Sequence, residues 1–272
     1  MDATTHAARS GFGPELVESA LAAASALAQP VPVFAIAGLQ GSGKSTLAAQ
    51  IARLAQIRGR RVAVLSIDDF YLGKAERARL GRNVHPLLAT RGPPGTHDLG
   101  LALQTLDSLH AGAVTQLPRF DKLADERAPE AQWPVMQGQC DLVVLEGWFL
   151  KTPPQQPEEL RSPINTLERE EDPGGTWREW CNAALGRDYP ALWQRIDALW
   201  FLRGPDFHVV PEWRWQQEQS LQARDPLRSG MDRAGVARFV QLFERISRQA
   251  LRTLPVIAER TITLDAQRRP EP

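Results

Sequence analysis

Short apolar runs recur along the chain and predict the strands of one buried sheet. Most are rich in β-branched and aliphatic residues, and polar residues, Gly or Pro separate them. They are too short for typical helices and too continuously apolar for half-exposed strands, so we expect a sheet that is buried on both faces. The runs cover residues 31–37, 61–67, 140–145, 196–202 and 261–264.

Segments with a helical spacing of apolar residues lie between these runs. Pro30 and Pro32 end the first of them, because proline does not continue a helix. Short apolar strands that alternate with helices are typical of a parallel sheet with helices on both faces. The pattern therefore predicts an α/β fold of three α/β/α layers around a parallel sheet of about five strands. The predicted helices cover residues 15–29, 44–57, 99–110 and 233–251.

No shift in composition divides the chain, so a single domain is predicted over residues 1–272. Residues 1–13 are expected to form a loose polar tail. Residues 151–175 are rich in Pro and acidic residues and are expected to form a surface insertion, in which the acidic run 168–172 faces solvent. Residues 83–97, which include RGPPGTH, are expected to form an ordered loop.

The charge balance and the two cysteines narrow the range of partners and locations. The chain has 32 Lys and Arg and 32 Asp and Glu, a balance that does not favour nucleic acid or an anionic membrane. No apolar run is long enough to cross a bilayer. Glu15 and Glu18 stand where a secretion signal would be basic. Cys140 and Cys181 are too few for a disulfide framework, so we expect reduced thiols and a cytoplasmic protein.

A glycine-rich segment predicts a phosphate-binding loop. Residues 38–45 (GLQGSGKS) match the pattern G-x-x-x-x-G-K-[ST] in full. The glycines permit backbone conformations that turn N–H groups onto a phosphate, and the helix that follows adds its positive N-terminal end. Lys44 is predicted to bridge the β- and γ-phosphates, and the Ser45 hydroxyl to bind Mg²⁺. The predicted nucleotide-binding residues are Gly38, Gly41, Ser42, Gly43, Lys44, Ser45 and Thr46.

The context of this motif distinguishes it from a chance turn, since it follows a predicted strand and begins a predicted helix. The predicted fold is therefore that of a P-loop NTPase. The motif alone does not separate a kinase from a GTPase, a motor or an ATP-driven chaperone. The sequence contains no N-K-x-D motif for reading guanine, which favours ATP.

Acidic residues follow two of the predicted strands. Asp68 and Asp69 follow the second apolar run, and Glu146 follows the third. Ligands of such sheets bind beyond the carboxyl ends of the strands. A kinase acting on an alcohol needs a base beside the hydroxyl and a bound Mg²⁺. Asp68 is the predicted base, and Glu146 is predicted to organise Mg²⁺ with Ser45. Asp69 is assigned to the catalytic group as a second base, a residue that orients Mg²⁺-bound water, or a helix cap. The alternative is that these acids have no catalytic role and lie in turns, in helix caps or on the surface.

Several motifs together resemble the D-glycerate 3-kinase family, within the wider phosphoribulokinase, uridine kinase and pantothenate kinase group. They are GLQGSGKST, SIDDFYL, RGPPGTHD, LPRFDK and LEGW, and the resemblance extends from about residue 33 to residue 265. It implies transfer of the γ-phosphate of ATP, with Mg²⁺, to a hydroxyl of a small metabolite. D-glycerate is the acceptor that the family implies.

The resemblance also implies residues for the acceptor site. Asp68 matches the position regarded as the base in uridine kinases. His97 and Asp98 match a loop that borders the acceptor pocket, and Arg119 and Lys122 match a hairpin that lies over the acceptor. Phe120 replaces a family Tyr, and residues 123–133 are shorter than the matching segment of the plant enzymes. A nucleoside or pantothenate therefore stays open as the acceptor.

A helical lid over ATP is implied at about residues 204–230, where Trp213, Arg214 and Glu218 match a W-R-x-x-x-E pattern. A small carboxylate favours arginine partners, so Arg91, Arg119 and Arg214, with Lys122, are candidate acceptor ligands. For Arg91 an exposed surface position is the alternative. A regulatory or chaperone NTPase remains the competing function, and the sequence leaves the oligomeric state open.

Overall fold

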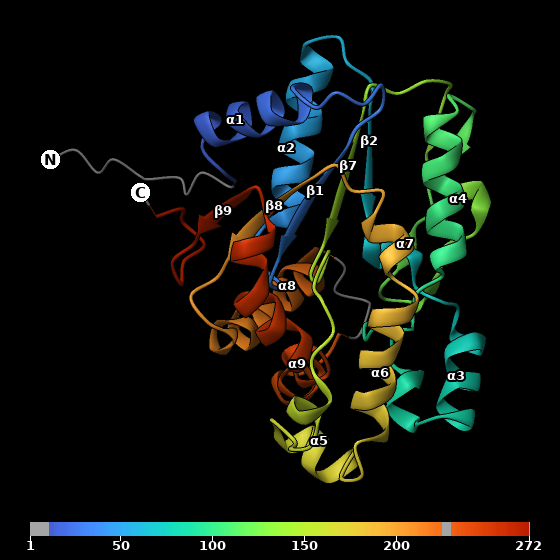
Figure 1. The fold of residues 1–272 in the computed structure, drawn as a ribbon, viewed down its shortest axis with the longest axis vertical. Helices are drawn as coiled ribbons and strands as arrows, with labels where there is room; N and C mark the ends of the chain where they lie inside the picture. The colour runs from blue at the N-terminus through green and yellow to red at the C-terminus, as the bar shows by residue number, and fades with distance from the viewer. Residues whose placement is uncertain (1–10, 225–229, 272) are drawn as a thin grey trace, which may run out of the picture.

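A computed structural model describes residues 11–224 and 230–271 of the protein. Its central sheet has five strands in the order β2-β7-β1-β8-β9, and every neighbouring pair is parallel (Figure 1). This confirms the predicted parallel sheet. The strands are β1 (Val33–Gly38), β2 (Val62–Ser66), β7 (Leu142–Gly147), β8 (Ala198–Arg203) and β9 (Arg260–Thr263).

Side chains of β1 alternate between two apolar cores, one on each face of the sheet. Phe34 and Ile36 pack with α1 (Pro14–Ser25) and α2 (Lys44–Ile57). Val33, Ala35 and Ala37 point to the other face. That face is covered by α4 (Leu99–His110), α6 (Thr176–Arg187), α7 (Pro190–Trp193) and α9 (Arg233–Ile257). The three predicted layers are therefore present, which confirms the α/β/α fold.

Two helices outside the predicted set have little apolar periodicity. α3 (Lys74–Asn83) buries one side chain, Arg77, and α8 (Val210–Arg224) lacks an apolar stripe. The further helical segments are α5 (Thr166–Glu171), η1 (Ile67–Phe70), η2 (Pro86–Ala89), η3 (Glu130–Gln132), η4 (Pro157–Leu160) and η5 (Phe207–Val209). In the described ranges, no helix is both long and apolar enough to span a membrane.

Two small antiparallel pairs lie between α4 and β7 in the sequence. β3 (Thr115–Gln116) pairs with β6 (Val135–Met136), and β4 (Phe120–Asp121) pairs with β5 (Glu126–Arg127). Residues 118–128, which contain the second pair, are called the hairpin below. The strands are too short to show alternation, so their apolar pattern does not predict them.

The predicted tail and lid are only partly described. Residues 1–10 of the tail and 225–229 of the lid lie outside the described residues. Residues 11–13 are not loose, because Phe12 is buried and exchanges two 2.9 Å hydrogen bonds with the Gln50 side chain of α2. Most of the predicted lid is the helix α8, whose Trp213 is buried against the phosphate loop.

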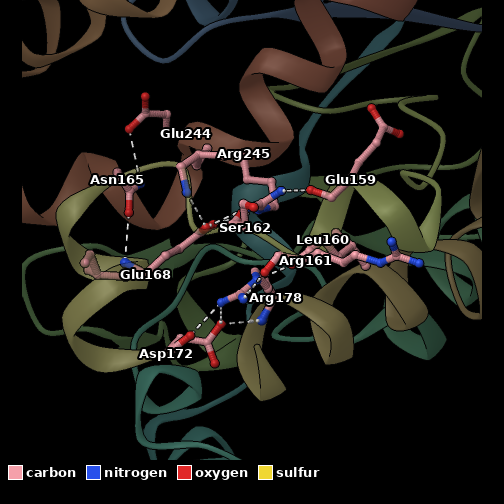
Figure 2. A network of polar contacts seen from close by, with 12 residues as sticks. Glu159, Leu160, Arg161, Ser162, Asn165, Glu168, Asp172, Arg178, Glu244 and Arg245 are labelled. Carbon is pink, nitrogen blue, oxygen red and sulfur yellow. Dashed lines mark hydrogen bonds and ion pairs between the residues drawn. The ribbon is translucent and has the colours of Figure 1, made fainter. Parts of the chain in front are cut away.

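Buried ion pairs connect residues 151–175 with α6 and α9 (Figure 2). The Arg245 guanidinium of α9 pairs with the Glu168 carboxylate at 2.6 Å. It also donates to the backbone carbonyls of Glu159 and Ser162, at 2.9 and 2.8 Å. Asp172 pairs with Arg178 at 2.9 Å. The expectation that residues 168–172 face solvent is therefore wrong for Glu168 and Asp172, which are buried. Their arginine partners lie outside the acidic run, so its composition does not reveal their burial.

Glu168→Ala is expected to destabilise the fold by about 3–5 kcal/mol, because it leaves the buried Arg245 charge without its carboxylate. The measurement is the free energy of unfolding in urea. Glu171→Ala is a matched control on the same helix, since Glu171 makes an exposed ion pair with Arg238 of α9. That variant should cost under about 1 kcal/mol. Equally small losses would mean that backbone carbonyls alone satisfy Arg245.

Candidate active site

A cleft of about 740 Å³ lies beyond the carboxyl ends of β1, β2 and β7. Its lining comes from the phosphate loop, the ends of β2 and β7, the hairpin, α8 and α9. The predicted site residues that line it are Gly41, Gly43, Lys44, Ser45, Thr46, Asp68, Arg91, Lys122, Glu146 and Arg214. Those that do not line it are Gly38, Ser42, Asp69, His97, Asp98 and Arg119.

The phosphate loop has the backbone that its glycines allow. Gly41 and Gly43 adopt φ values of 80° and 94°, a region that side chains disfavour. A Cβ atom on Gly41 would lie 2.7 Å from the Cβ atom of Trp213 in α8. The glycine therefore serves two purposes: it permits the turn, and it lets α8 approach the loop.

Lys44 is a buried cation at the start of α2. Its ammonium donates to the Leu39 carbonyl at 3.0 Å. Burial lowers the pKa of Lys44, although the charges of Glu146 and Asp68 act in the opposite direction. A nearby phosphate would supply the negative charge that stabilises this ammonium.

The two predicted Mg²⁺ ligands lie in contact. The Ser45 hydroxyl of the loop donates to Oε1 of Glu146, at the end of β7, at 2.8 Å. Serine hydroxyl and carboxylate oxygens are hard ligands that suit Mg²⁺. Within the described part of the chain, the buried Ser42 hydroxyl has no hydrogen-bond partner. These groups fit a nucleotide phosphate with its metal ion.

Both carboxylate oxygens of Asp68 are occupied. The Tyr71 hydroxyl donates to Oδ1 at 2.7 Å, and the Lys122 ammonium contacts Oδ2 at 2.5 Å. Burial raises the pKa of Asp68, but the charge and hydrogen bond of Lys122, the Tyr71 hydrogen bond and the Lys44 charge outweigh it. The pKa is held well below its usual range, so the carboxylate is ionised at neutral pH.

Cations dominate the cleft, and most have internal partners. Arg91 pairs with Asp125 of the hairpin, and Arg214 pairs with Glu218 at 2.8 Å. Arg268, which was not among the predicted site residues, lines the cleft after β9. Its place after the last strand is the feature that could have identified it. Among the described residues, the lining has two carboxylates, Asp68 and Glu146, and five cations, Lys44, Arg91, Lys122, Arg214 and Arg268.

Known proteins with similar chains are kinases. No protein-family model matches the chain. An uncharacterized kinase of Schizosaccharomyces pombe, mug58, is 32% identical over 226 residues, which cover 78% of this chain and 80% of that protein. The chloroplastic D-glycerate 3-kinase of Arabidopsis thaliana is 30% identical over 225 residues, which cover 79% of this chain and 46% of that protein. The solved D-glycerate 3-kinase of Cryptococcus neoformans has a TM-score of 0.74 at 26% identity, over 95% of this chain and 96% of that one.

The chain belongs to the D-glycerate 3-kinase family of P-loop kinases. The predicted family is thereby confirmed. The protein is a phosphotransferase that acts on a small metabolite. Its match to the plant enzyme spans about half the length of that protein.

In this kinase Asp69 points away from the cleft, although it adjoins Asp68. Its Oδ1 accepts from the Phe120 backbone N–H at 3.1 Å, and its Oδ2 lies 3.4 Å from the Arg119 guanidinium. Burial raises the pKa of Asp69 to about 6, against the opposing charge of Arg119. This placement disfavours the predicted catalytic role of Asp69 and the predicted acceptor contact of Arg119. Instead, the two side chains fasten the hairpin to the end of β2.

His97 and Asp98 likewise lie outside the lining of the kinase cleft. The His97 Nδ1 atom lies 2.6 Å from the Tyr189 hydroxyl, its ring packs on that of Tyr71, and burial lowers its pKa to about 3. Asp98 caps α4 and pairs with Arg127 of the hairpin at 3.0 Å. Both residues support the cleft wall from behind Tyr71 and the hairpin.

Gly41→Ala is expected to weaken Mg-ATP binding on the order of 10- to 100-fold, because the new Cβ atom forces the loop and α8 apart. Isothermal titration calorimetry measures the affinity. Gly59→Ala is the matched control, with a φ of 75° and no neighbouring atom within 4 Å of the added Cβ. It should leave the affinity unchanged. An equal loss in both variants would contradict the role of the Trp213 contact.

Asp69→Asn should change the dependence of stability on pH. The pKa of Asp69 is about 6 in the fold and 3.8 ordinarily, so the folded state binds the proton more tightly. The resulting stabilisation is fully present below about pH 4 and is lost as the pH rises through about 6. Wild-type stability relative to the variant should therefore fall by on the order of 2 kcal/mol over this interval. Urea denaturation at a series of pH values measures it, and a constant difference would argue against the raised pKa.

Proposed function

We propose that the protein is an ATP-dependent D-glycerate 3-kinase, which transfers the γ-phosphoryl group of ATP to the 3-hydroxyl of D-glycerate. The observation that supports this most is the cleft itself, whose described lining has five cations and two carboxylates, one of which is Asp68. ATP phosphates and an acceptor carboxylate together need such an excess. The names of the Arabidopsis and Cryptococcus relatives support the same acceptor.

The nucleotide side of the cleft is assigned to the phosphate loop. The Lys44 ammonium and the N-terminal end of α2 would hold the phosphates. Ser45 and Glu146 would hold Mg²⁺, directly or through water. When bound, Mg²⁺ neutralises negative charge on the phosphates. Arg214 and Arg268 would add positive charge from the other side of the nucleotide.

Asp68 is assigned as the base. The acceptor hydroxyl oxygen forms a bond to the γ-phosphorus, the bond from that phosphorus to the β–γ bridging oxygen breaks, and ADP leaves. The hydroxyl proton passes to the Asp68 carboxylate. The low pKa keeps the carboxylate ionised, as a base must be before it takes a proton, and it also makes the carboxylate a weak base while Lys122 contacts it.

ADP release from Mg-ATP tests the acceptor directly. D-glycerate is expected to stimulate release strongly, whereas uridine, pantothenate and the absence of an acceptor are not. A small carboxylate fits the cationic lining, and a nucleoside needs a different pocket. Stimulation by uridine or pantothenate instead would replace the acceptor. Slow hydrolysis of ATP at a rate that no acceptor changes would favour a regulatory NTPase.

Asp68→Asn is expected to lower kcat with D-glycerate by about 100-fold or more, because the amide cannot take the hydroxyl proton. ATP affinity should stay nearly unchanged, because the phosphates bind elsewhere. Steady-state kinetics and calorimetry measure the two quantities. Asp107→Asn, on an exposed part of α4, is the control and should retain full activity. An Asp68→Asn enzyme with most of its turnover would refute the assignment of the base.

A further inference from the structure

Each carboxylate oxygen of the proposed base already has a partner. Tyr71 occupies Oδ1 and Lys122 occupies Oδ2. An acceptor hydroxyl needs one of these oxygens within hydrogen-bond reach in order to pass on its proton. A carboxylate oxygen can accept more than one hydrogen bond, but an ammonium in contact with it opposes its protonation, so transfer of the proton is favoured when that partner moves away.

Lys122 is the partner that is built to move. Its side chain is 50% exposed, whereas Tyr71 is 3% exposed. A lysine side chain has four flexible methylene groups, so its ammonium can travel while its backbone stays in place. The Tyr71 ring is fixed between the rings of His97 and Phe120.

The backbone of Lys122 is held from two sides. Arg91 donates to the Lys122 carbonyl at 3.0 Å and pairs with Asp125 of the same hairpin. Asp69 accepts from the backbone N–H of Phe120, two residues before Lys122. These contacts fix the position of the Lys122 backbone. The fold therefore places the Lys122 side chain beside Asp68.

Three cations of the cleft, Arg91, Arg214 and Lys122, each already contact a carboxylate, and each would have to share or leave that contact in order to bind an acceptor carboxylate. Arg91 and Arg214 would have to share their bonds to Asp125 and Glu218. Lys122 would leave the base itself. Recruitment of the Lys122 ammonium by an acceptor is therefore coupled to exposure of Asp68.

We propose that Lys122 masks Asp68 until an acceptor with a carboxylate near its reacting hydroxyl draws the ammonium away. This inference rests on the proposed function and names the device that selects its acceptor. With Lys122 moved, the acceptor hydroxyl passes its proton to the freed Asp68 oxygen as its own oxygen bonds to the γ-phosphorus and ADP departs. Loss of the Lys122 charge also raises the proton affinity of Asp68, because that charge opposes the effect of burial. Water and uncharged polyols have no carboxylate to attract the ammonium, so the γ-phosphoryl group of ATP is not transferred to them.

Glycerol provides the matched probe, because it replaces the carboxylate of D-glycerate with a neutral hydroxymethyl group. Initial rates of ADP formation are measured with D-glycerate, with glycerol and without an acceptor. The enzymes are the wild type, Lys122→Met, which removes the charge, and Lys122→Arg, which keeps it. Lys74→Met alters an exposed lysine outside the cleft lining and is the control. Lys122→Gln repeats the neutral substitution with a polar side chain.

The wild type and Lys74→Met should prefer D-glycerate strongly. In Lys122→Met and Lys122→Gln, kcat/KM for D-glycerate should fall on the order of 100-fold, because the site loses the partner of the carboxylate. The glycerol-dependent and acceptor-free rates should rise above those of the wild type, because Asp68 is unmasked. Lys122→Arg should keep the wild-type order of rates.

A rise in the glycerol-dependent and acceptor-free rates would distinguish masking of Asp68 by Lys122 from a role of Lys122 only in binding the acceptor. If the neutral variants lower all three rates together, or keep the wild-type preference, the proposal is overturned. If D-glycerate does not raise the rate of ADP formation by the wild type, the proposed function is refuted, together with D-glycerate as its acceptor. An active wild type whose selectivity survives the loss of Lys122 refutes the masking alone.

Discussion

The parallel pairing of three strands is the constraint on which the site depends. β7 lies between β1 and β2, and its Glu146 is in register with Ile36 on one side and Ser66 on the other. Because the strands are parallel, their carboxyl ends meet at one edge of the sheet. The phosphate loop, Asp68 and Glu146 therefore converge there, although more than a hundred residues separate the first from the last. Apolar side chains of these strands pack into a core on each face of the sheet, which holds the strands together.

Charge compensation organises the rest of the molecule around that edge. Glu168 and Arg245 neutralise each other inside the fold and help to hold α9, which places Phe239 and Phe243 at the cleft. At the phosphate loop, the buried Lys44 ammonium and Ser42 hydroxyl have few protein partners among the described residues, as expected of groups that serve a ligand. Glu168 and Arg245 therefore satisfy each other, whereas a bound phosphate would satisfy the buried Lys44 charge of the cleft.

The hairpin is a small element that places one side chain, Lys122, at the cleft. Asp69, Arg91 and Arg127 fix it to three different segments. Its Lys122 then reaches the base. Two adjacent aspartates thus have separate tasks. One faces the cleft and is held ionised, and the other faces the hairpin and has a raised pKa.

The sequence by itself determined the features that depend on neighbours along the chain. The phosphate loop, the five strands and the acids at their ends could be predicted, because short motifs and apolar runs carry them. Only the tertiary structure decided which of Asp68 and Asp69 faces the cleft, since that depends on a hairpin about fifty residues away. It also decided that Arg119 turns to Asp69, that Glu168 is buried, and that Arg268 joins the site. These outcomes depend on partners distant in sequence, and the direction of a charged side chain follows from the partners that the fold brings to it.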